Sequence, residues 1–568
     1  MATEDLIFIL ILLVVTVVLA VPIGKYMSKV FTGQRTFMTP VMQPVERFIY
    51  RLVGVDENEE MNWKRYAYSL IVFNIIAILF LFTLQLLQGY LPLNPEGFPG
   101  VRWDTALNTA ISFVTNTNWQ SYAGETTMSY LTQMMGLAVQ NFVSAAVGIA
   151  AVLVLIRGFI RKNTENLGNF WVDMTRSVLY ILLPLSVILA LLLVSQGVVQ
   201  TFDPYATAQT IEGANQIIPL GPAASQVAIK MLGSNGGGFF NVNSAHPFEN
   251  PNGITNFLES IAILLLPMSL VFAFGYMIRN FKQGLAIFAV MMILFVTGLG
   301  VALWSEDQTN PIIEKMGVSS GNLEGKEVRL GVGESTAWGA ATTIVSNGGV
   351  NMMHDSAMPL TGLVFMFNMA TGEVIFGGLG VGLAGMLFYV ILTMFIAGLM
   401  IGRTPEFLGK KLGPPEMTLA VIPLVVPQAA ILILAAIALS TPDGLAGLNN
   451  PSAHGMSEIL YAYFSTIGNN GSAFAGLSAN TVFYNLTLGL AMLIGRFATI
   501  IPAIALAGLL AKKGKVPTSS ATFPTTGPLF IILVAGVVIL LGALTFFSVF
   551  ALGPGLDHLF MQGGNITS

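Results

Sequence analysis

Four short polar loops contain the residues of this sequence that could bind an ion without a charged group. Each loop combines Asn, Ser or Thr with small neighbours and follows a short amphipathic stretch. Their centres lie near residues 116, 235, 347 and 469, so that consecutive loops are 112 to 122 residues apart. A recurring distance of this size is typical of an internal repeat.

The candidate ion-binding residues are uncharged, and many are glycines, of which the chain has 59. The first two loops supply Thr115, Asn116, Thr117, Asn118 and Gln120, and Ser234, Asn235, Gly236, Gly237 and Gly238. The last two supply Ser346, Asn347, Gly348 and Gly349, and Gly468, Asn469, Asn470, Gly471 and Ser472. Because glycine allows backbone angles that turn successive carbonyls to one side, we expect the main ligands to be the carbonyls of residues 115–118, 234–238, 346–349 and 468–472.

Four such loops around one axis predict a filter for a large monovalent cation. A ring of carbonyls can replace the hydration shell of K⁺. No acidic residue lies in any of the four loop centres, which argues against a divalent-cation site. Asn-Gly and Gly-Gly pairs also mark ordinary surface turns, but four at matched spacing favour a pore. The first loop differs in composition, because residues 115–118 contain no glycine.

Long apolar segments must hold these loops in a membrane. The chain has 568 residues, of which 54% are hydrophobic and only 10% are charged, whereas a soluble protein has about 25% charged residues. An apolar run of about 18 residues or more predicts a membrane span. We expect ten spans, at residues 5–24, 66–89, 130–157, 172–196, 256–278, 284–304, 372–400, 418–440, 483–511 and 526–551.

The predicted fold is all-α and polytopic, with four helix–pore loop–helix pseudo-repeats of K⁺ channel-like type and one extra helix at each end. Irregular backbone survives at membrane depth only where it lines a cavity, so the four loops should share one. The expected units are 1–65 (first span and cytoplasmic loop), 66–157, 172–278, 284–400 and 418–511 (repeats 1 to 4), and 512–568 (last span).

The basic residues predict the orientation of the spans. Alternate connections carry 19 of the 25 Lys and Arg residues, and the positive-inside rule makes that side cytoplasmic. Both termini and all four polar loops are then expected outside. Glu4 and Asp5 precede the first span, and Lys25 and Lys29 follow it, which favours a retained span over a cleaved signal peptide.

Composition also excludes several functions. The net charge of -4 argues against nucleic-acid binding, which needs clustered Lys and Arg. The absence of cysteine excludes disulfides and thiolate metal sites. We find neither a Gly-x-x-x-x-Gly-Lys-Ser/Thr phosphate loop nor an Asp-Lys-Thr-Gly motif. We therefore expect no catalytic site in this chain and no ATP hydrolysis by the chain alone.

The sequence resembles the potassium-binding subunits of bacterial Kdp P-type ATPases along its whole length. The resemblance is carried by the motifs at residues 115–122, 236–241, 243–251, 401–406 and 469–476. It implies selection of external K⁺ as substrate, without an organic cofactor, and ATP-driven high-affinity uptake through a separate P-type pump subunit. It also implies two small partner subunits and a location among the lipids of the bacterial plasma (inner) membrane.

Two features are candidates for a gate or ion path below the loops. Arg496 lies near the middle of the span at 483–511, where a charge costs at least about 2.5 kcal/mol; it either ties helices together or acts as a fixed charge against cation leakage. Residues 372–385 include six glycines, which weakens a helix. They either pack helices closely or form an unwound gate, and the resemblance favours a gate containing Gly372, Glu373, Gly377 and Gly378.

Two other functions remain open from the sequence. An autonomous K⁺ channel or K⁺ symporter of the same architecture would need no ATPase. A secondary transporter with broken helices would bind an organic solute near the middle of the membrane and would show an inverted repeat. Because all four polar loops are expected on one side, the sequence supports this second alternative only weakly.

Overall fold

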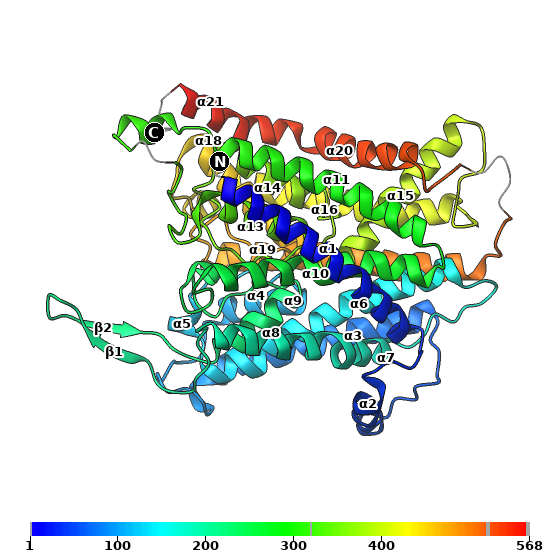
Figure 1. Ribbon diagram of the computed structural model, residues 1–568, viewed down its shortest axis with the longest axis horizontal. Coiled ribbons are helices and arrows are strands. Elements are labelled where there is room, and N and C mark those ends of the chain that lie inside the picture. Colours follow the sequence, from blue (N-terminus) through cyan, green and yellow to red (C-terminus); the bar gives the residue numbers. More distant parts are fainter. Residues whose placement is uncertain (1–2, 319–320, 518–522, 564–568) are drawn as a thin grey trace.

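Ten long apolar helices form the body of the protein in a computed structural model, which describes residues 3–318, 321–517 and 523–563. Each is long and apolar enough to cross a membrane, and they run side by side in Figure 1. They contain α1 (Thr3–Phe31), α3 (Trp63–Leu87), α6 (Val139–Ile160), α7 and α8 (Phe170–Arg176 and Leu183–Ser195), α10 (Gly253–Met277), α11 (Phe281–Glu306), α15 (Val381–Met400), α16 (Pro414–Ser440), α19 (Val482–Lys512) and α20 (Pro528–Phe550).

Four shorter helices lie between pairs of these spans and end at the four polar loops. They are α4 (Trp103–Val114), α9 (Ala223–Leu232), α13 (Gly331–Ile344) and α18 (Ser452–Gly468). All four lie in the half of the bundle from which a β-hairpin projects (Figure 1). The predicted order of one extra helix at each end and four helix–pore loop–helix units is confirmed.

Smaller elements connect the spans. The helices are α2 (Thr39–Val53), α5 (Gly124–Thr127), α12 (Pro311–Lys315), α14 (Pro359–Ala370), α17 (Pro442–Leu445) and α21 (Leu556–Gln562). Short 3₁₀ turns cover Gln88–Tyr90 and Asn243–Ala245, and π-helical turns cover Thr132–Ala138, Ser177–Leu182 and Ala551–Gly555. The antiparallel strand pairs are β1 (Ala206–Gln209) with β2 (Asn215–Ile218), and β3 (Glu406–Phe407) with β4 (Lys410–Lys411).

The span expected at residues 372–400 differs from the prediction. Its helix, α15, begins only at Val381, and a second short helix, α14, precedes it. Residues 371–380 between them form no helix, and φ is positive at Gly372, Glu373, Phe376, Gly377 and Gly380. A right-handed helix cannot contain such residues. The second span of the third repeat is therefore built from two helices, α14 and α15, joined by an unwound segment.

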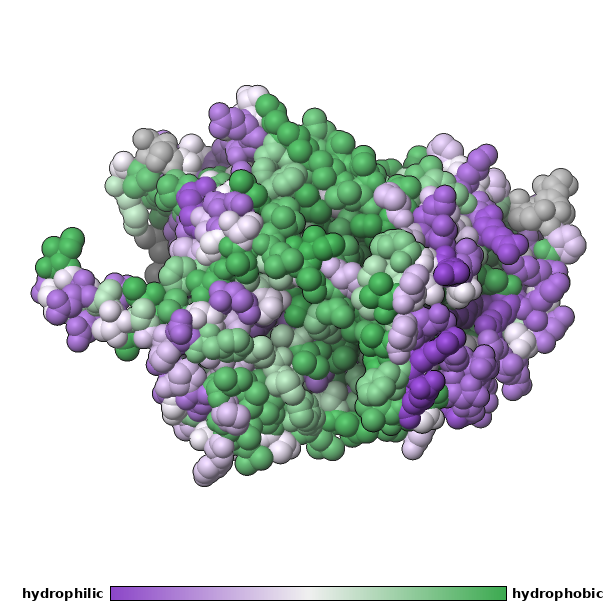
Figure 2. Space-filling view, turned by 60° about the horizontal axis from the view of Figure 1, so that its bottom comes forward, coloured by the Kyte–Doolittle hydropathy of each residue, from purple (hydrophilic) through white to green (hydrophobic). Residues whose placement is uncertain are grey.

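The most enclosed spans surround the polar loops. Of the most apolar stretch of each span, 83% of the residues are buried in the one containing α6 and 89% in α10, but only 22% in α1 and 33% in the one containing α20. The first two are therefore interior, and the last two form part of the outer surface. Figure 2 shows that surface as an apolar band around the middle of the bundle, with hydrophilic residues gathered at the right-hand end.

Candidate cation filter

The four polar loops form a closed ring at the ends of the short helices. We define loop 1 as residues 115–120, loop 2 as 234–238, loop 3 as 346–349 and loop 4 as 468–472. Neighbouring loops approach so closely that a side chain on three of the glycines would collide with the next backbone. These approaches run from Gly236 to Asn347, from Gly348 to Asn470 and from Gly471 to Thr117. Hydrogen bonds between loops 1 and 2, described below, complete the ring.

The backbone of each loop contains two left-handed residues separated by one residue of negative φ. The pairs are Asn116 and Asn118, Ser234 and Gly236, Ser346 and Gly348, and Asn469 and Gly471, with φ between 50° and 95°. Loop 1 adopts this pattern without glycine because asparagine tolerates the left-handed region better than most residues. The exceptional composition of loop 1 therefore does not change its backbone.

The first left-handed residue of each loop also bonds to the following loop. Its side chain is always Asn or Ser, which can donate a hydrogen bond, whereas glycine could supply only the backbone angle. The bonds are Asn116 Nδ2 to the Ser234 carbonyl (2.7 Å), Ser234 Oγ to the Val345 carbonyl (2.7 Å), Ser346 Oγ to the Gly468 carbonyl (3.3 Å) and Asn469 Nδ2 to Thr117 Oγ1 (2.9 Å). We call this closed set of four bonds the belt.

The middle residues of loops 2 to 4 are asparagines that bond in the opposite direction, to the preceding repeat. Asn235 Nδ2 donates to Asn116 Oδ1, Asn347 Nδ2 to the Lys230 carbonyl and Asn470 Nδ2 to the Thr342 carbonyl, at 2.6, 3.2 and 2.8 Å. In loop 1 the equivalent Thr117 instead shares a hydrogen bond with Thr115 at 2.8 Å. The polar side chains are thus used to hold the loops against one another.

The remaining predicted residues support the outer ends of the loops. Gln120 clamps Gly238, donating to its carbonyl at 2.9 Å and accepting from its N–H at 2.8 Å. A side chain on Gly237 would meet that of Asn118. Two contacts stay within one loop: Gly349 N–H to Asn347 Oδ1 at 2.9 Å, and Ser472 Oγ to Asn470 Oδ1 at 2.5 Å.

A cavity of about 780 Å³, which we call the vestibule, opens on one side of the ring. Its lining includes the second left-handed residue of every loop: Asn118, Gly236, Gly348 and Gly471. Gln120 and the segments that follow the loops complete the wall. The vestibule therefore gives an ion access to all four loops at once.

The unwound segment 371–380 lies against the other side of the ring. The Gly377 N–H donates to the Ile344 carbonyl at 2.8 Å, and a side chain on Gly378 would lie 3.0 Å from Ser346 Cβ. A cavity of only about 40 Å³ lies there, and its lining includes Ser346, Gly372 and Asn469. The predicted gate residues thus lie directly beneath loops 3 and 4.

Glu373 lies fully buried in this segment, beside Gly468. Neither of its carboxylate oxygens has a hydrogen-bond partner among the residues that the structure describes. Asn470 is a polar neighbour of the carboxylate, and its amide group, which has two donor hydrogens, also donates to the Thr342 carbonyl. A buried carboxylate with so few donors is costly, so this group is suited to a bound cation.

Arg496 is buried in α19 and reaches loop 1 through α6. Its Nη2 donates to the Ser144 carbonyl at 2.7 Å, and Ser144 Oγ donates to Asn116 Oδ1 at 2.8 Å. Its Nε has no partner in the described part of the chain. The predicted tying of helices by this residue is therefore present, and a fixed positive charge lies close to the ring.

Comparison with known proteins identifies the family. The sequence model of the family KdpA, described as "Potassium-transporting ATPase A subunit", matches residues 10–559. The chain belongs to the KdpA family. Similar KdpA proteins include the potassium-transporting ATPase potassium-binding subunits of Pseudomonas putida (55% identical; 98% of this chain and 99% of the relative covered) and Pseudomonas entomophila (56% identical; 94% and 95% covered). This chain is a multi-pass membrane protein and a non-catalytic subunit of a potassium-transporting ATPase.

The fold extends beyond the KdpA family. The crystal structure of the potassium transporter TrkH from Vibrio parahaemolyticus superposes with a TM-score of 0.51 at 13% identity, covering 88% of this chain and 98% of that chain. At this identity the likeness concerns the fold alone.

Lys230 of this KdpA family member is a site residue that the sequence did not reveal. Although its side chain is charged, it is fully buried in α9. The ammonium group binds the Glu249 carboxylate and donates to Asn243 Oδ1 at 2.5 Å. Asn243 Nδ2 in turn donates to the Gly236 carbonyl at 2.5 Å. The sequence feature that could have revealed this residue is a lysine within a short, mostly apolar amphipathic segment, followed by the motif at residues 243–251.

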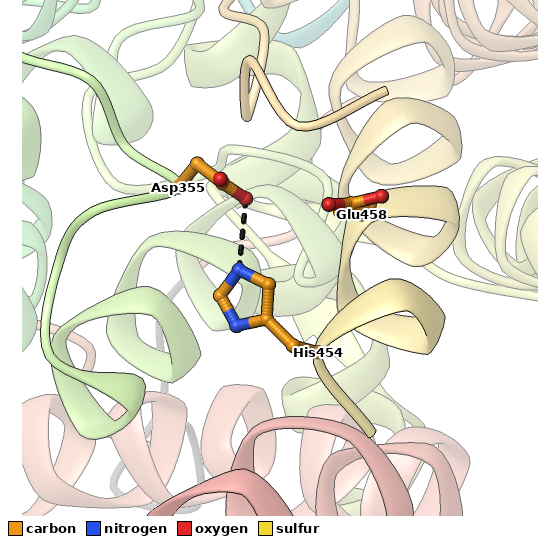
Figure 3. A group of neighbouring side chains, drawn as sticks. All are labelled: Asp355, His454 and Glu458. Carbon is orange, nitrogen blue, oxygen red and sulfur yellow. Dashed lines mark hydrogen bonds and ion pairs between the residues drawn. The ribbon is translucent and has the colours of Figure 1, made fainter. Parts of the chain in front are cut away.

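A cluster of titratable residues lies at the start of α18, on the same side as the vestibule. His454 hydrogen-bonds Asp355 at 2.9 Å through Nε2, as Figure 3 shows, and Asp557 at 2.8 Å through Nδ1. Glu458, one turn further on, accepts from Asn450. Burial lowers the pKa of His454, but hydrogen bonds and charges of the two aspartates outweigh it and raise the pKa to about 10. Because both ring nitrogens of His454 are hydrogen-bonded to carboxylates, the cluster joins α21 to α18.

Proposed function

We propose that the four loops bind and select K⁺ from outside the cell and that the chain delivers it to an ATP-hydrolysing partner subunit for high-affinity uptake. The observation that carries this proposal is the repeated pair of left-handed residues, present in all four loops and held by the belt. Alternating left- and right-handed backbone directs successive carbonyls to one side, and four such strands offer K⁺ a substitute for its water shell. The relatives are named potassium-binding subunits of potassium-transporting ATPases.

The proposed filter consists of the carbonyls of residues 115–118, 234–238, 346–349 and 468–472, with Gln120 supporting its outer end. Uncharged ligands suit a monovalent ion, and most asparagine and serine side chains are used between the loops. The ring width is then set by side-chain hydrogen bonds, each contributing about 1 kcal/mol. Residues 66–157, 172–278, 284–400 and 418–511 supply one loop each, as four repeats.

The proposed route continues past the unwound segment 371–380, which acts as the gate. Glu373 would attract K⁺ that leaves the filter, while the positive charge of Arg496 would oppose free flow into the cell. The cavity of about 40 Å³ beneath the ring is too confined for an open aqueous path, so transport would require this segment to move.

We further propose that the chain lies in the bacterial inner membrane with both termini and the vestibule outside. The distribution of basic residues supports this orientation. Two small subunits are expected beside the pump subunit, from the resemblance to Kdp complexes. Membrane lipids would surround the apolar outer surface of the bundle.

The experiment that tests the proposal compares the purified complex with the isolated chain. We expect the complex to hydrolyse ATP in response to K⁺ at micromolar-range concentrations, and the isolated chain in liposomes to pass K⁺ only slowly. Passive K⁺ flux at channel rates through the isolated chain would contradict delivery to a pump and would favour an autonomous channel. K⁺ flux driven by an ion gradient without ATP would favour a symporter.

A broken-helix transporter for an organic solute is supported least. All four short helices and their loops lie in one half of the bundle (Figure 1), whereas an inverted repeat would place them in both halves.

A further inference from the structure

Helix α2 lies across the ends of the spanning helices rather than parallel to them. Figure 1 shows it nearly end-on, at the lower right and at the opposite end of the bundle from the β-hairpin. It connects the end of α1 at Phe31 with the start of α3 at Trp63. A helix that lies across the spans runs along the membrane surface, here at the end that carries most of the basic residues.

One face of α2 is apolar and uncovered. The large side chains of this face are between 44% and 78% exposed, and they recur at intervals of four, four, three and four residues, as one helix face requires. They are Val41, Val45, Phe48 and Leu52 of α2, and Phe37 in the turn just before it. Because exposed apolar surface of this extent marks an interaction site, we refer to these five residues as the apolar row.

The opposite face of α2 is fixed to the protein by one buried carboxylate. Glu46 accepts hydrogen bonds from Arg176 Nε and the Tyr180 hydroxyl, both at 2.7 Å, and from the Tyr50 hydroxyl at 2.8 Å. Arg176 and Tyr180 belong to the fourth span. These bonds set the rotation of α2 about its axis, so the apolar row is held away from the bundle.

Basic side chains flank the apolar row. Arg47 and Arg51 are exposed one turn apart on α2. A polar cavity of about 400 Å³ between α2 and the fourth span is lined by Arg35 and Arg176 among other residues. The carboxylates of Glu59 and Glu60 downstream of α2 are paired with Arg65 and Arg161. Asp56 and Glu57, just beyond α2, line a cavity together with Arg47 and Arg51. On α2 itself the only exposed charged side chains are these two arginines, so the helix surface suits an anionic partner.

We propose that α2 is a membrane-surface helix that binds anionic phospholipid in the leaflet on the basic side of the protein. The apolar row inserts among the acyl chains, and Arg47, Arg51 and Arg35 lie at the level of the phosphates. Amphipathic helices with basic residues bind membranes in this way, and each basic residue near an anionic surface contributes about 1 kcal/mol. In Figure 2 the apolar band ends where the hydrophilic end of the molecule begins, on the side where α2 lies.

The lack of native cysteine allows the depth of α2 to be measured with single nitroxide labels on the complete complex. We choose Phe48→Cys for the apolar row, Leu10→Cys on the exposed face of α1 as a deep reference, and Asn58→Cys beyond α2 as a water reference. In phosphatidylcholine–phosphatidylglycerol vesicles, we expect the label at 48 to collide with oxygen more than with a soluble nickel chelate. Its depth should lie between the two references.

Two results would overturn the insertion of α2. One is a label at 48 as accessible to nickel as the label at 58. The other is a label at 48 that is shielded from both reagents in the complex but not in the isolated chain, since that would make a partner subunit the occupant of this face.

The preference for anionic lipid is tested separately. The double variant R47Q/R51Q should lower the preference of the complex for phosphatidylglycerol over phosphatidylcholine, measured by lipid retention, by about 30-fold. The matched control R279Q/K282Q removes two exposed charges at the same end but none from α2, and it should keep the preference. Equal retention in wild type and R47Q/R51Q would contradict the role of these arginines.

Discussion

The four filter loops and the segment 371–380 are both rich in glycine and left-handed residues, yet they are held in different ways. Each filter loop is tied to its neighbours by the belt and by the reverse asparagine bonds. The segment has few such ties: Gly377 N–H bonds Ile344, and the Tyr389 hydroxyl reaches the Thr371 carbonyl at 3.3 Å. Side-chain hydrogen bonds therefore bridge the unusual backbone in the filter loops, whereas close packing of glycines holds most of the segment 371–380. Glycine content alone does not distinguish a binding site from a hinge.

Gly348→Ala should have the largest effect. The added methyl group would meet the Asn470 backbone at a position with φ of +80°, so the ring must widen. We expect the K⁺ concentration that half-stimulates ATP hydrolysis to rise at least tenfold, and discrimination against Na⁺ and Rb⁺ to become poorer. Gly300→Ala on α11, where the added atom meets nothing within 4 Å, serves as control. Unchanged selectivity in Gly348→Ala would remove loop 3 from the filter.

Gly372→Ala tests the segment 371–380. The new side chain would meet only Val374 Cγ1, at 3.9 Å, but the left-handed backbone at φ of +80° becomes strained, at roughly 1–2 kcal/mol. We expect the maximal rate of K⁺-stimulated ATP hydrolysis to fall by up to about tenfold, with the half-stimulating K⁺ concentration unchanged. A change in K⁺ affinity without a change in rate would show that the segment belongs with the filter.

Asn469→Gly separates backbone from belt. Glycine keeps the left-handed angle but removes two hydrogen bonds of Asn469 Nδ2, the belt bond to Thr117 Oγ1 and a bond to the Met492 carbonyl in α19, each worth about 1 kcal/mol. We expect a roughly fivefold loss of apparent K⁺ affinity, measured by the same titration, and less affinity still for Asn469→Ala, which adds backbone strain. If Asn469→Gly matches wild type, the belt does not set the width of the ring.

The His454 cluster should have the smallest effect on K⁺ binding, because it lies outside the ring. Since folding raises the pKa of His454 from 6.5 to about 10, its contribution to stability is complete below about pH 6.5 and is lost as the pH rises through 10. The thermal unfolding temperature of the complex should therefore fall more towards pH 10 in wild type than in His454→Gln. If the unfolding temperature depends on pH identically in the two proteins, the charge of His454 does not stabilise the cluster.

The main outline of the fold could be predicted because ten apolar runs and four polar loops are local features of the sequence. Helix α14 could not be predicted as a membrane element, since its 12 residues are too few to span the hydrocarbon. The belt depends on which loop lies beside which, and spacing along the chain does not contain that information. The contacts of Lys230 could not be predicted for a similar reason: its partner Glu249 lies 19 residues away, and only packing brings them together.

Because one chain supplies all four loops, the ring can be altered one quarter at a time. In a homotetrameric pore, a single substitution changes every junction by symmetry. Here each belt bond is encoded separately, and loop 2 already differs, since Asn243 and the charge of Lys230 hold its Gly236 carbonyl. A single substitution can thus change the hydrogen bond at one junction of the ring while the other three junctions stay as they are.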